Sequence, residues 1–271
     1  MPLDVTVIIG VGGMGRSIAR RQGAGRRLVL ADANQETLNA VADELRGDGF
    51  EVASQHVDVT DRASVEALAG WASELGQVRQ VAHTAGLSPM QASRDAVLAV
   101  DLLGVANAID AFEEVIAPGG AAVVIASMAG SALVGKLPPE VEQALRETPT
   151  EQLAGLPIWQ APEFADGGAT YSLAKRANQL RVEARAAAWG AKGARINSIS
   201  PGIIATPMGQ TELEGESGAM MRGMIEHSAL KRVGTPVDIA HAAGFLLSPL
   251  AGFITGTDLL VDGGQHLVMG G

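Results

Sequence analysis

The stretch Val5-Thr-Val-Ile-Ile-Gly-Val-Gly-Gly-Met-Gly15 decides the fold of this chain of 271 residues. Its first five residues are apolar or β-branched, which predicts a buried strand. Gly10, Gly12 and Gly15 then follow the G-x-G-x-x-G spacing, and the residues after Gly15 have a helical composition. Such a turn between a strand and a helix lets backbone N–H groups approach a pyrophosphate at the helix N-terminus. We therefore expect a dinucleotide-binding turn here.

A second apolar run covers residues 28–31 and ends at Asp32. In dinucleotide-binding folds a carboxylate roughly 20 residues after the glycines holds the ribose hydroxyls of NAD. The same charge repels the 2′-phosphate of NADP, and the next residues, Ala33 and Asn34, bring no cation to attract it. NAD is therefore the expected cofactor. An alternative interpretation makes Asp32 the N-cap of the following helix.

The composition excludes several classes of protein. Apolar residues make up 47% and charged residues 18%, which is ordinary for a globular α/β chain, and the length suits one large domain. A formal net charge of −10 disfavours nucleic acid and anionic membrane surfaces as partners. The absence of cysteine rules out disulfides and thiolate catalysis, and the five histidines lack ligand spacing, so no metal is expected. Neither a secretory signal nor an apolar run of transmembrane length is visible, which predicts a cytoplasmic protein.

Strand-like and helix-like segments alternate along the chain. Further strands are expected near residues 50–55, 78–83, 121–126, 194–199 and 259–261, and helices near 35–46, 63–75, 96–116, 168–190 and 237–247. This alternation predicts a doubly wound parallel sheet with helices on both faces. Ligands of such sheets bind at the carboxyl ends of the strands. The residues expected to gather at that edge are Gly10, Asp32, Asp58, Gly86, Ser127 and Pro201.

Residues 133–166 interrupt the alternation. They contain five prolines and several carboxylates, with a short helix expected near 140–147. A connection of this length usually forms a lid, a binding surface or an oligomer contact. A solvated excursion without chemistry is the other interpretation.

Tyr171 and Lys175 lie four positions apart in a segment of helical composition, so they share one face of the expected helix. A phenol ordinarily titrates near pH ~10, too high for proton exchange at neutrality. A fixed positive charge beside it favours the phenolate, and the phenol then becomes an acid or base for an alcohol or carbonyl. A chance Tyr-x-x-x-Lys pair in an ordinary helix is the alternative when the two residues are considered alone.

Taken together, these motifs resemble the short-chain dehydrogenase/reductase family. The resemblance covers nearly all of residues 5–264. It rests on the glycine turn, Asp58-Val59, Ala85-Gly86, Ser127, Tyr171-x-x-x-Lys175, Asn197-Ser-Ile-Ser-Pro-Gly202 with Thr206, and Val261-Asp-Gly-Gly264. It implies an α/β fold over residues 1–271, a single Rossmann-like domain with a doubly wound seven-stranded parallel sheet and an insertion before the catalytic helix.

The family's functional residues carry over to matching positions. The resemblance implies that Tyr171 is the acid/base, that Lys175 lowers its pKa and holds the nicotinamide ribose, and that Ser127 orients the substrate oxygen. Residues 207–230 correspond to the family's mobile substrate lid. The residues it implies for cofactor binding are Gly10, Gly13, Met14, Gly15, Asp32, Asp58, Val59, Ala85, Gly86, Tyr171, Lys175, Pro201, Gly202, Ile204 and Thr206.

Three features depart from the family pattern. The glycine turn is one residue shorter than usual, with Ile9 in place of a threonine. Asp101 stands where the family has a catalytic asparagine; it either supports a proton relay through its backbone or pairs with Lys175 and changes the pKa of Tyr171. Ser127 and Tyr171 are farther apart in sequence than in typical members, because of residues 133–166. An insertion at this place resembles the bacterial 3α-hydroxysteroid dehydrogenase/carbonyl reductase branch, in which it alters the subunit interface.

The sequence thus favours an NAD-dependent oxidoreductase that transfers a hydride between nicotinamide and a secondary alcohol or ketone, with bulky apolar or steroid-like compounds among the candidates. One alternative is a catalytically weak nucleotide-sensing or scaffold protein on the same fold. Another is reduction of an activated carbon–carbon double bond, which the close spacing of Tyr171 and Lys175 disfavours. The resemblance also implies a homodimer or homotetramer, built through the apolar C-terminal residues 251–271.

Overall fold

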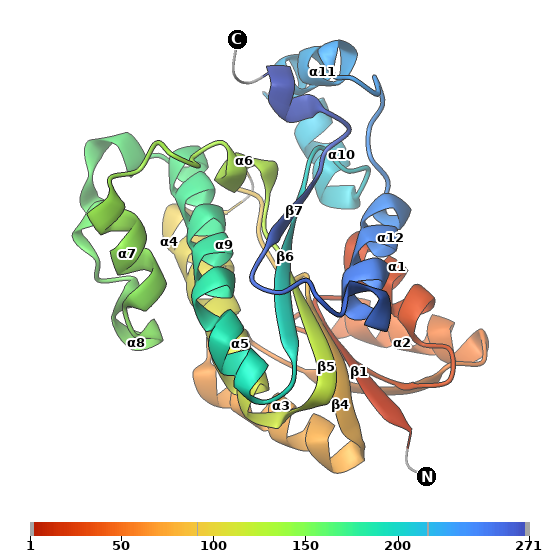
Figure 1. Ribbon diagram of the computed structural model, residues 1–271. Helices are drawn as coiled ribbons and strands as arrows, with labels where there is room; N and C mark the ends of the chain where they lie inside the picture. The colour runs from red at the N-terminus through yellow and green to blue at the C-terminus, as the bar shows by residue number, and fades with distance from the viewer. Residues whose placement is uncertain (1–2, 91, 216, 269–271) are drawn as a thin grey trace.

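A computed structural model describes residues 3–90, 92–215 and 217–268. They form one α/β domain around a seven-stranded, all-parallel sheet in the order β3-β2-β1-β4-β5-β6-β7 (Figure 1). The strands are β1 (Asp4–Ile9), β2 (Arg27–Asp32), β3 (Glu51–His56), β4 (Gln77–His83), β5 (Ile116–Ile125), β6 (Arg195–Pro201) and β7 (Asp258–Val261). The expected parallel sheet is confirmed, although β5 begins earlier than its apolar run indicates.

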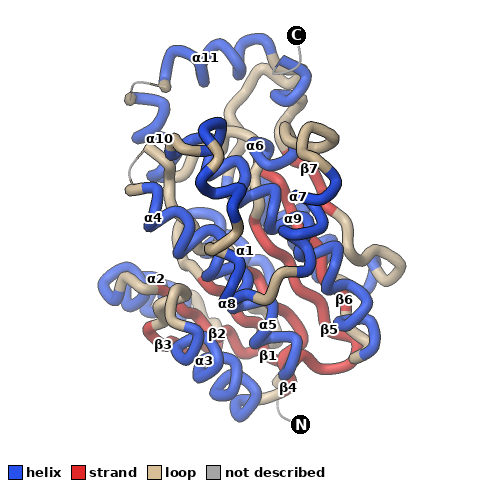
Figure 2. The backbone as a smooth tube through the Cα atoms, turned by 90° about the vertical axis from the view of Figure 1, so that its left-hand side faces the viewer, coloured by secondary structure: helices blue, strands red, loops and turns tan. Residues whose placement is uncertain are grey.

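Helices cover both faces of the sheet, as the alternation predicts (Figures 1 and 2). On one face lie α1 (Gly13–Gln22), α2 (Gln35–Gly47) and α12 (Pro236–Leu247), which enclose one buried apolar cluster with the sheet. On the other face α3 (Arg62–Leu75), α5 (Val105–Val115) and α9 (Gly167–Ala191) enclose a second cluster. Burial of apolar side chains on both faces explains why the central strands are almost continuously apolar.

The helix expected near residues 96–116 is not uniform. It consists of a short α4 (Arg94–Val97), a π-helical stretch η1 (Leu98–Gly104) and α5. The wider π-helical turn carries Asp101, whose backbone carbonyl accepts a hydrogen bond of 2.9 Å from Asn178 Nδ2 of α9. Periodicity did not predict this change, because a single widened turn leaves the apolar pattern nearly intact.

Residues 133–166 pack against α9 and η1 instead of extending into solvent. After α6 (Met128–Ser131) they form α7 (Pro139–Glu147), α8 (Thr150–Leu153) and the 3-10 turns η2 (Pro157–Gln160) and η3 (Pro162–Phe164). Their buried side chains, including Leu145, Trp159 and Phe164, build a third apolar cluster with α9. The interpretation of a solvated excursion is therefore wrong, since large apolar side chains fasten the segment to the helix that carries Tyr171.

Beyond the carboxyl ends of the strands lie α10 (Pro207–Glu214) and α11 (Gly218–His227), at the top of Figure 1. Thr206 begins α10 as its N-cap, accepting a hydrogen bond from the Gly209 N–H, and Pro207 follows at the first helical position. These helices make up most of the lid expected at 207–230, of which residue 216 lies outside the described residues. None of the helices in the described part of the chain is long and apolar enough to cross a membrane.

Candidate active site

The glycine-rich turn between β1 and α1 needs two of its glycines for steric reasons. Gly10 has φ +88°, and a Cβ added to it would lie 2.4 Å from the Ala85 backbone nitrogen. A Cβ on Gly15 would lie 1.9 Å from the Gly10 carbonyl oxygen. Gly12 is the N-cap of α1 and supplies no side-chain cap, and a Cβ on it would meet no described atom within 4 Å. The start of α1 therefore has open space and N–H groups directed towards it, which suits a phosphate.

Asp32 lies at the end of β2 beside this turn. Its two carboxylate oxygens accept hydrogen bonds of 2.8 Å from the backbone N–H groups of Val11 and Asn34. The N-cap of α2 is Asn34, whose side chain accepts a hydrogen bond of 2.9 Å from the Thr37 N–H. The alternative role of Asp32 as that helix cap is therefore wrong. The carboxylate is fixed at the edge where a ribose is expected.

The other residues expected to bind a cofactor follow the strand ends in the same way. Thr206 lies beside the glycine turn, because a Cβ on Gly13 would be 3.1 Å from Thr206 Cγ2. Asp58 lies in an exposed turn after β3 and accepts hydrogen bonds from Thr60, whereas the neighbouring Val59 is buried. Further expected residues at this edge are Ala85 and Gly86 after β4, and Pro201, Gly202 and Ile204 at and after the end of β6.

Tyr171, Lys175 and Asn178 lie on one face of α9, which begins near the carboxyl ends of the strands and packs against one face of the sheet. The Lys175 Nζ is 5.5 Å from the centre of the Tyr171 ring and donates a hydrogen bond of 3.2 Å to the carbonyl of Ile125, the last residue of β5. Ser127 follows two residues later and begins α6 as its N-cap, and its side chain is near enough to the Tyr171 phenol to lower the pKa of that phenol. The ammonium group thus lies beside the phenol, and both are near the end of β5 that Ser127 follows.

Asp101 forms a buried ion pair with Lys175. Its Oδ1 is 2.9 Å from Lys175 Nζ, and the two side chains are 0% and 4% exposed. Its Oδ2 accepts a hydrogen bond of 3.0 Å from the Leu87 N–H. Gly86 makes room for the pair, since a Cβ there would lie 2.7 Å from Asp101 Oδ1. Of the two expected roles of Asp101, the structure contains the pairing with Lys175, and the Asp101 backbone carbonyl accepts its hydrogen bond from Asn178.

The pKa of Tyr171 lies above its ordinary value in this arrangement. Burial raises this pKa most, and the charge of Lys175 lowers it. Of the smaller effects, the charges of Asp101 and Glu212 raise the pKa and the Ser127 side chain lowers it. Lys175 therefore acts in the expected direction, but burial and the two carboxylates outweigh its charge in the pKa of the phenol. For Lys175, burial lowers the pKa, yet the charge of Asp101, Tyr171 and the hydrogen bond to Asp101 hold it above its usual range.

Sequence reasoning missed several residues around this site. Asn178 follows Tyr171 and Lys175 on the same helix face, so helical spacing gave a usable signal. His83, the last residue of β4, is 2% exposed, and burial followed by the charge of Lys175 lowers its pKa to about 3. Ser88, in the loop after β4, donates a hydrogen bond to Glu212 of α10. Neither His83 nor the Ser88–Glu212 contact had a local sequence signal, since their partners are distant in sequence.

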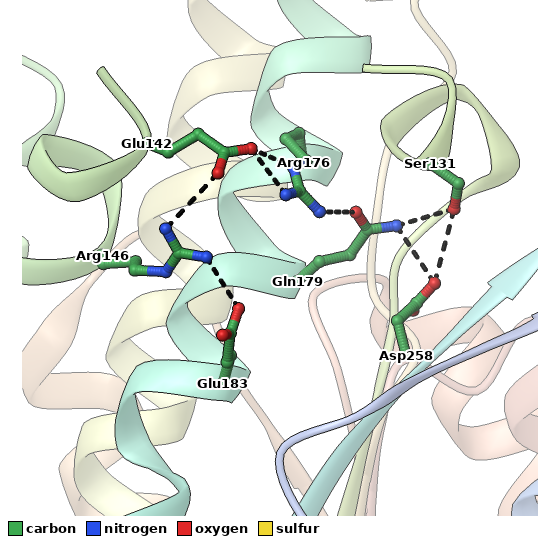
Figure 3. Close-up of polar contacts among 7 residues, drawn as sticks. All are labelled: Ser131, Glu142, Arg146, Arg176, Gln179, Glu183 and Asp258. Atoms are coloured by element: carbon green, nitrogen blue, oxygen red, sulfur yellow. Dashed lines mark hydrogen bonds and ion pairs between the residues drawn. The ribbon is translucent and has the colours of Figure 1, made fainter. Parts of the chain in front are cut away.

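A neighbouring face of α9 holds the insertion by ion pairs (Figure 3). Arg176 reaches Glu142 of α7 with an N–O distance of 2.6 Å. Arg146, also on α7, lies 2.9 Å from Glu183 of α9. Charged groups on two successive turns of α7 thus pair with α9, which fixes the insertion alongside the helix that carries Tyr171 and Lys175.

Gln179 continues this polar network from α9 to the strands (Figure 3). It accepts a hydrogen bond from Arg176 and donates to Ser131 Oγ at 2.9 Å and to Asp258 Oδ2 at 3.2 Å. Ser131 belongs to α6, the short helix that Ser127 begins. The insertion, the helix of Tyr171 and Lys175, and the segment of Ser127 are therefore linked by one chain of hydrogen bonds.

Comparison with known proteins bears on the assignment. The family model described as "short chain dehydrogenase" matches residues 4–138, and the one described as "Enoyl-(Acyl carrier protein) reductase" matches residues 156–266. The short-chain dehydrogenase/reductase bsc3 of Alternaria brassicicola is 40% identical over 97% of this chain and 96% of its own length. The galactitol 2-dehydrogenase (L-tagatose-forming) of Cereibacter sphaeroides is 31% identical over 93% of this chain and 90% of that protein. The 3-alpha-hydroxysteroid dehydrogenase/carbonyl reductase of Comamonas testosteroni is 33% identical over 68% and 71% of the two chains.

Solved structures agree with these sequence relatives. The structure of levodione reductase superposes with a TM-score of 0.76 at 26% identity, covering 97% of this chain and 98% of the other. Full-length similarity in sequence, with the agreement in fold, shows the family of this chain. The chain belongs to the short-chain dehydrogenase/reductase family.

Proposed function

We propose that this oxidoreductase uses NAD to interconvert a secondary alcohol and its ketone, with Tyr171 as the acid/base. The observation that carries the proposal is the arrangement around Tyr171, whose ring lies beside the Lys175 ammonium group, with the Ser127 side chain near enough to influence the pKa of its phenol. A hydroxyl and a phenol that share one substrate oxygen are the groups needed to move its proton and to stabilise its developing charge.

The residues at the strand ends suit a nicotinamide dinucleotide. Gly10 and Gly15 leave a cradle that a Cβ would fill, and the uncapped start of α1 offers N–H groups to a pyrophosphate. The Asp32 carboxylate favours the free ribose hydroxyls of NAD over the 2′-phosphate of NADP. The nearby cations Arg16 and Arg20 pair with Glu44, so their charge is already partly neutralised. A bound nicotinamide ring supplies the hydride acceptor for oxidation and the donor for reduction.

Within that site each side chain has a defined task. In the oxidative direction the Tyr171 phenolate takes the proton of the substrate hydroxyl. Ser127 donates a hydrogen bond to the same oxygen and orients it. Lys175 favours the phenolate through its charge, and Asp101 holds the Lys175 ammonium group in place through the 2.9 Å ion pair. Asp101 is a positioning residue in this scheme. In reduction the same groups act in reverse.

The variant Tyr171→Phe tests the proposal, because it removes one oxygen and keeps the ring. Turnover of secondary alcohols, followed as NADH absorbance, should fall at least about 100-fold, while NADH binding measured by fluorescence titration stays nearly intact. Wild-type protein assayed with NAD and NADP side by side should prefer NAD. Retained turnover in Tyr171→Phe would refute the acid/base assignment. A preference for NADP would refute the role given to Asp32.

Two alternatives are separated by the same assay. A nucleotide-sensing or scaffold protein would bind NADH yet turn over no alcohol or ketone in a broad panel that includes steroid alcohols. A carbon–carbon double-bond reductase, the activity named in the description of the family model that matches residues 156–266, would consume NADH with enoyl thioesters. The spacing of Tyr171 and Lys175 favours neither alternative.

The proposal also includes a substrate lid at 207–230 and a homo-oligomer. Support for the oligomer comes from Phe245, Leu250 and Phe253, which are 41%, 85% and 105% exposed at and after the end of α12. Three large apolar side chains exposed within one short segment are typical of a subunit contact. Sedimentation equilibrium should give a dimer or tetramer, and a monomer at micromolar concentration would contradict this part.

A further inference from the structure

The loop after β4 meets the lid helix α10 next to the catalytic groups. Ser88 is 2% exposed, accepts a hydrogen bond of 3.1 Å from the Met90 N–H and donates one to the carboxylate of Glu212. The pair joins two segments that are far apart in sequence and bridges the end of the sheet. Because the two residues belong to separate segments, the folding of neither segment alone explains why this buried hydroxyl is bonded to a carboxylate.

Three observations put this pair at the substrate side of Tyr171. The residue before Ser88 is Leu87, whose N–H binds Asp101, the partner of Lys175. The residue after it is Pro89, whose carbonyl oxygen would lie 3.3 Å from a Cβ on Gly167, in the first turn of the helix that carries Tyr171. In addition, the charge of Glu212 is near enough to raise the pKa of the Tyr171 phenol.

We propose that Ser88 and Glu212 form a hydroxyl-binding pair that selects substrates with a second hydroxyl near the reacting one. This inference rests on the proposed function and names its substrate class, vicinal diols and polyols or the matching hydroxyketones. The substrate hydroxyl takes the place of the direct Ser88–Glu212 bond. It donates to the carboxylate of Glu212 and accepts from the hydroxyl of Ser88.

The chemistry of the pair favours a hydroxyl over other polar groups. A carboxylate requires a donor, which excludes a ketone or an ether at this position. A serine hydroxyl that has lost its acceptor seeks another one, and an ammonium group has no lone pair to provide it. A hydroxyl satisfies both partners, whereas an apolar substituent would separate Ser88 from Glu212 and leave the buried serine without an acceptor.

Matched substrates test the inference. Wild-type protein is assayed with NAD and either trans-cyclohexane-1,2-diol or cyclohexanol, and with butane-2,3-diol or butan-2-ol. Each diol should exceed its mono-alcohol in kcat/KM by about tenfold or more, the range expected for a hydrogen bond to a charged group. In Glu212→Ala and in Ser88→Ala the diol-to-mono-alcohol ratio should fall by about tenfold. Glu212→Gln, which keeps an accepting oxygen but loses the charge, should give an intermediate ratio.

The matched control is Glu74→Ala, which removes the same charge from an exposed position of α3, outside the lid. It should leave the ratio at the wild-type value, and thermal melting of every variant should show that folding is preserved. A ratio near one in the wild type, or a ratio unchanged in Glu212→Ala and Ser88→Ala, would overturn the inference while leaving the proposed function intact. A preference for 2-aminocyclohexanol over the diol would overturn the choice of a hydroxyl. NADH formation from neither member of either pair would overturn the proposed function, and this inference with it.

Discussion

Two lysines, one inside α9 and one at its C-terminal end, make ion pairs of equal length in very different surroundings. Lys175 Nζ lies 2.9 Å from Asp101, with side chains that are 4% and 0% exposed. Lys192 Nζ lies 2.9 Å from Glu114, with side chains that are 33% and 73% exposed. Water screens the second pair, whereas the first holds two charges in a medium that cannot solvate either of them alone. The N–O distance therefore says little about how much an ion pair affects stability. The burial of the two side chains decides most of that effect.

The polar network between α9 and the insertion lies between these extremes. Arg176 and Glu142 are 12% and 17% exposed in their side chains, so their pair is neither dry nor fully screened. The face of α9 that carries Lys175 is the one for which we propose a catalytic role, while Arg176 attaches the insertion to the helix. Charged residues on one helix differ in their surroundings: Lys175 lies at the end of β5 beside Asp101, whereas Arg176 faces the insertion.

The largest effect should come from breaking the buried pair. Lys175→Met leaves the Asp101 carboxylate buried and unpaired, and we expect a loss of about 3–5 kcal/mol in unfolding free energy together with loss of turnover. Lys192→Met, which breaks the exposed pair of the same length, should cost at most about 1 kcal/mol. Urea unfolding of both variants measures the difference. Equal losses in the two variants would contradict the role given to burial.

Next in size is the pH dependence caused by His83 behind the buried pair. Its folded-state pKa of about 3 lies below the ordinary value of 6.5, so the unfolded chain binds the extra proton. The contribution of His83 to the unfolding free energy is therefore fully present above pH 6.5 and is lost as the pH falls towards 3. Between pH 7 and pH 5 this group alone should lower the unfolding free energy by about 2 kcal/mol.

Urea unfolding at pH 7 and pH 5 checks this value. His83→Gln should show a flatter pH dependence than the wild type, whereas the exposed His241→Gln should follow the wild type. A His83→Gln protein with the full wild-type slope would show that other groups cause the acid sensitivity.

Asp101→Asn changes the charge of the buried pair while keeping its shape. Because the Asp101 charge raises the pKa of Tyr171, its removal should move the acidic limb of the pH–rate profile for alcohol oxidation to lower pH. Initial rates of NADH formation between pH 6 and pH 10 measure the shift (a range set by the ordinary phenol pKa of ~10). A profile that stays in place would mean that Asp101 acts only through packing.

The smallest effect should come from the attachment network. Glu142→Gln weakens the contacts to Arg176 and Arg146 and should cost about 1 kcal/mol in unfolding free energy, as for other partly exposed pairs. The exposed Glu140→Gln on the same helix is the control and should change stability very little. Calorimetric melting distinguishes the two. A loss as large as that of Lys175→Met would place this network in the same class as the buried pair.

The local patterns of the chain predicted most of the framework. The alternation of apolar strands with helices predicted the parallel sheet, and the spacing of Tyr171 and Lys175 predicted that they share a helix face. Both predictions depend only on residues a few positions apart. The π-helical turn at Asp101 and the packing of Trp159 against α9 were not predicted, since they depend on contacts with distant segments. The roles assigned to the cofactor-binding and catalytic residues stay predictions.

By itself, the sequence determined the alternation of strands and helices, the glycine turn and the identity of the groups available for chemistry, because backbone sterics and side-chain periodicity act locally. Only the tertiary structure decided that Asp101 pairs with Lys175, that Ser88 meets Glu212 and that the insertion packs on α9. These contacts join residues far apart in the chain, and their strength depends on burial, which no single segment specifies.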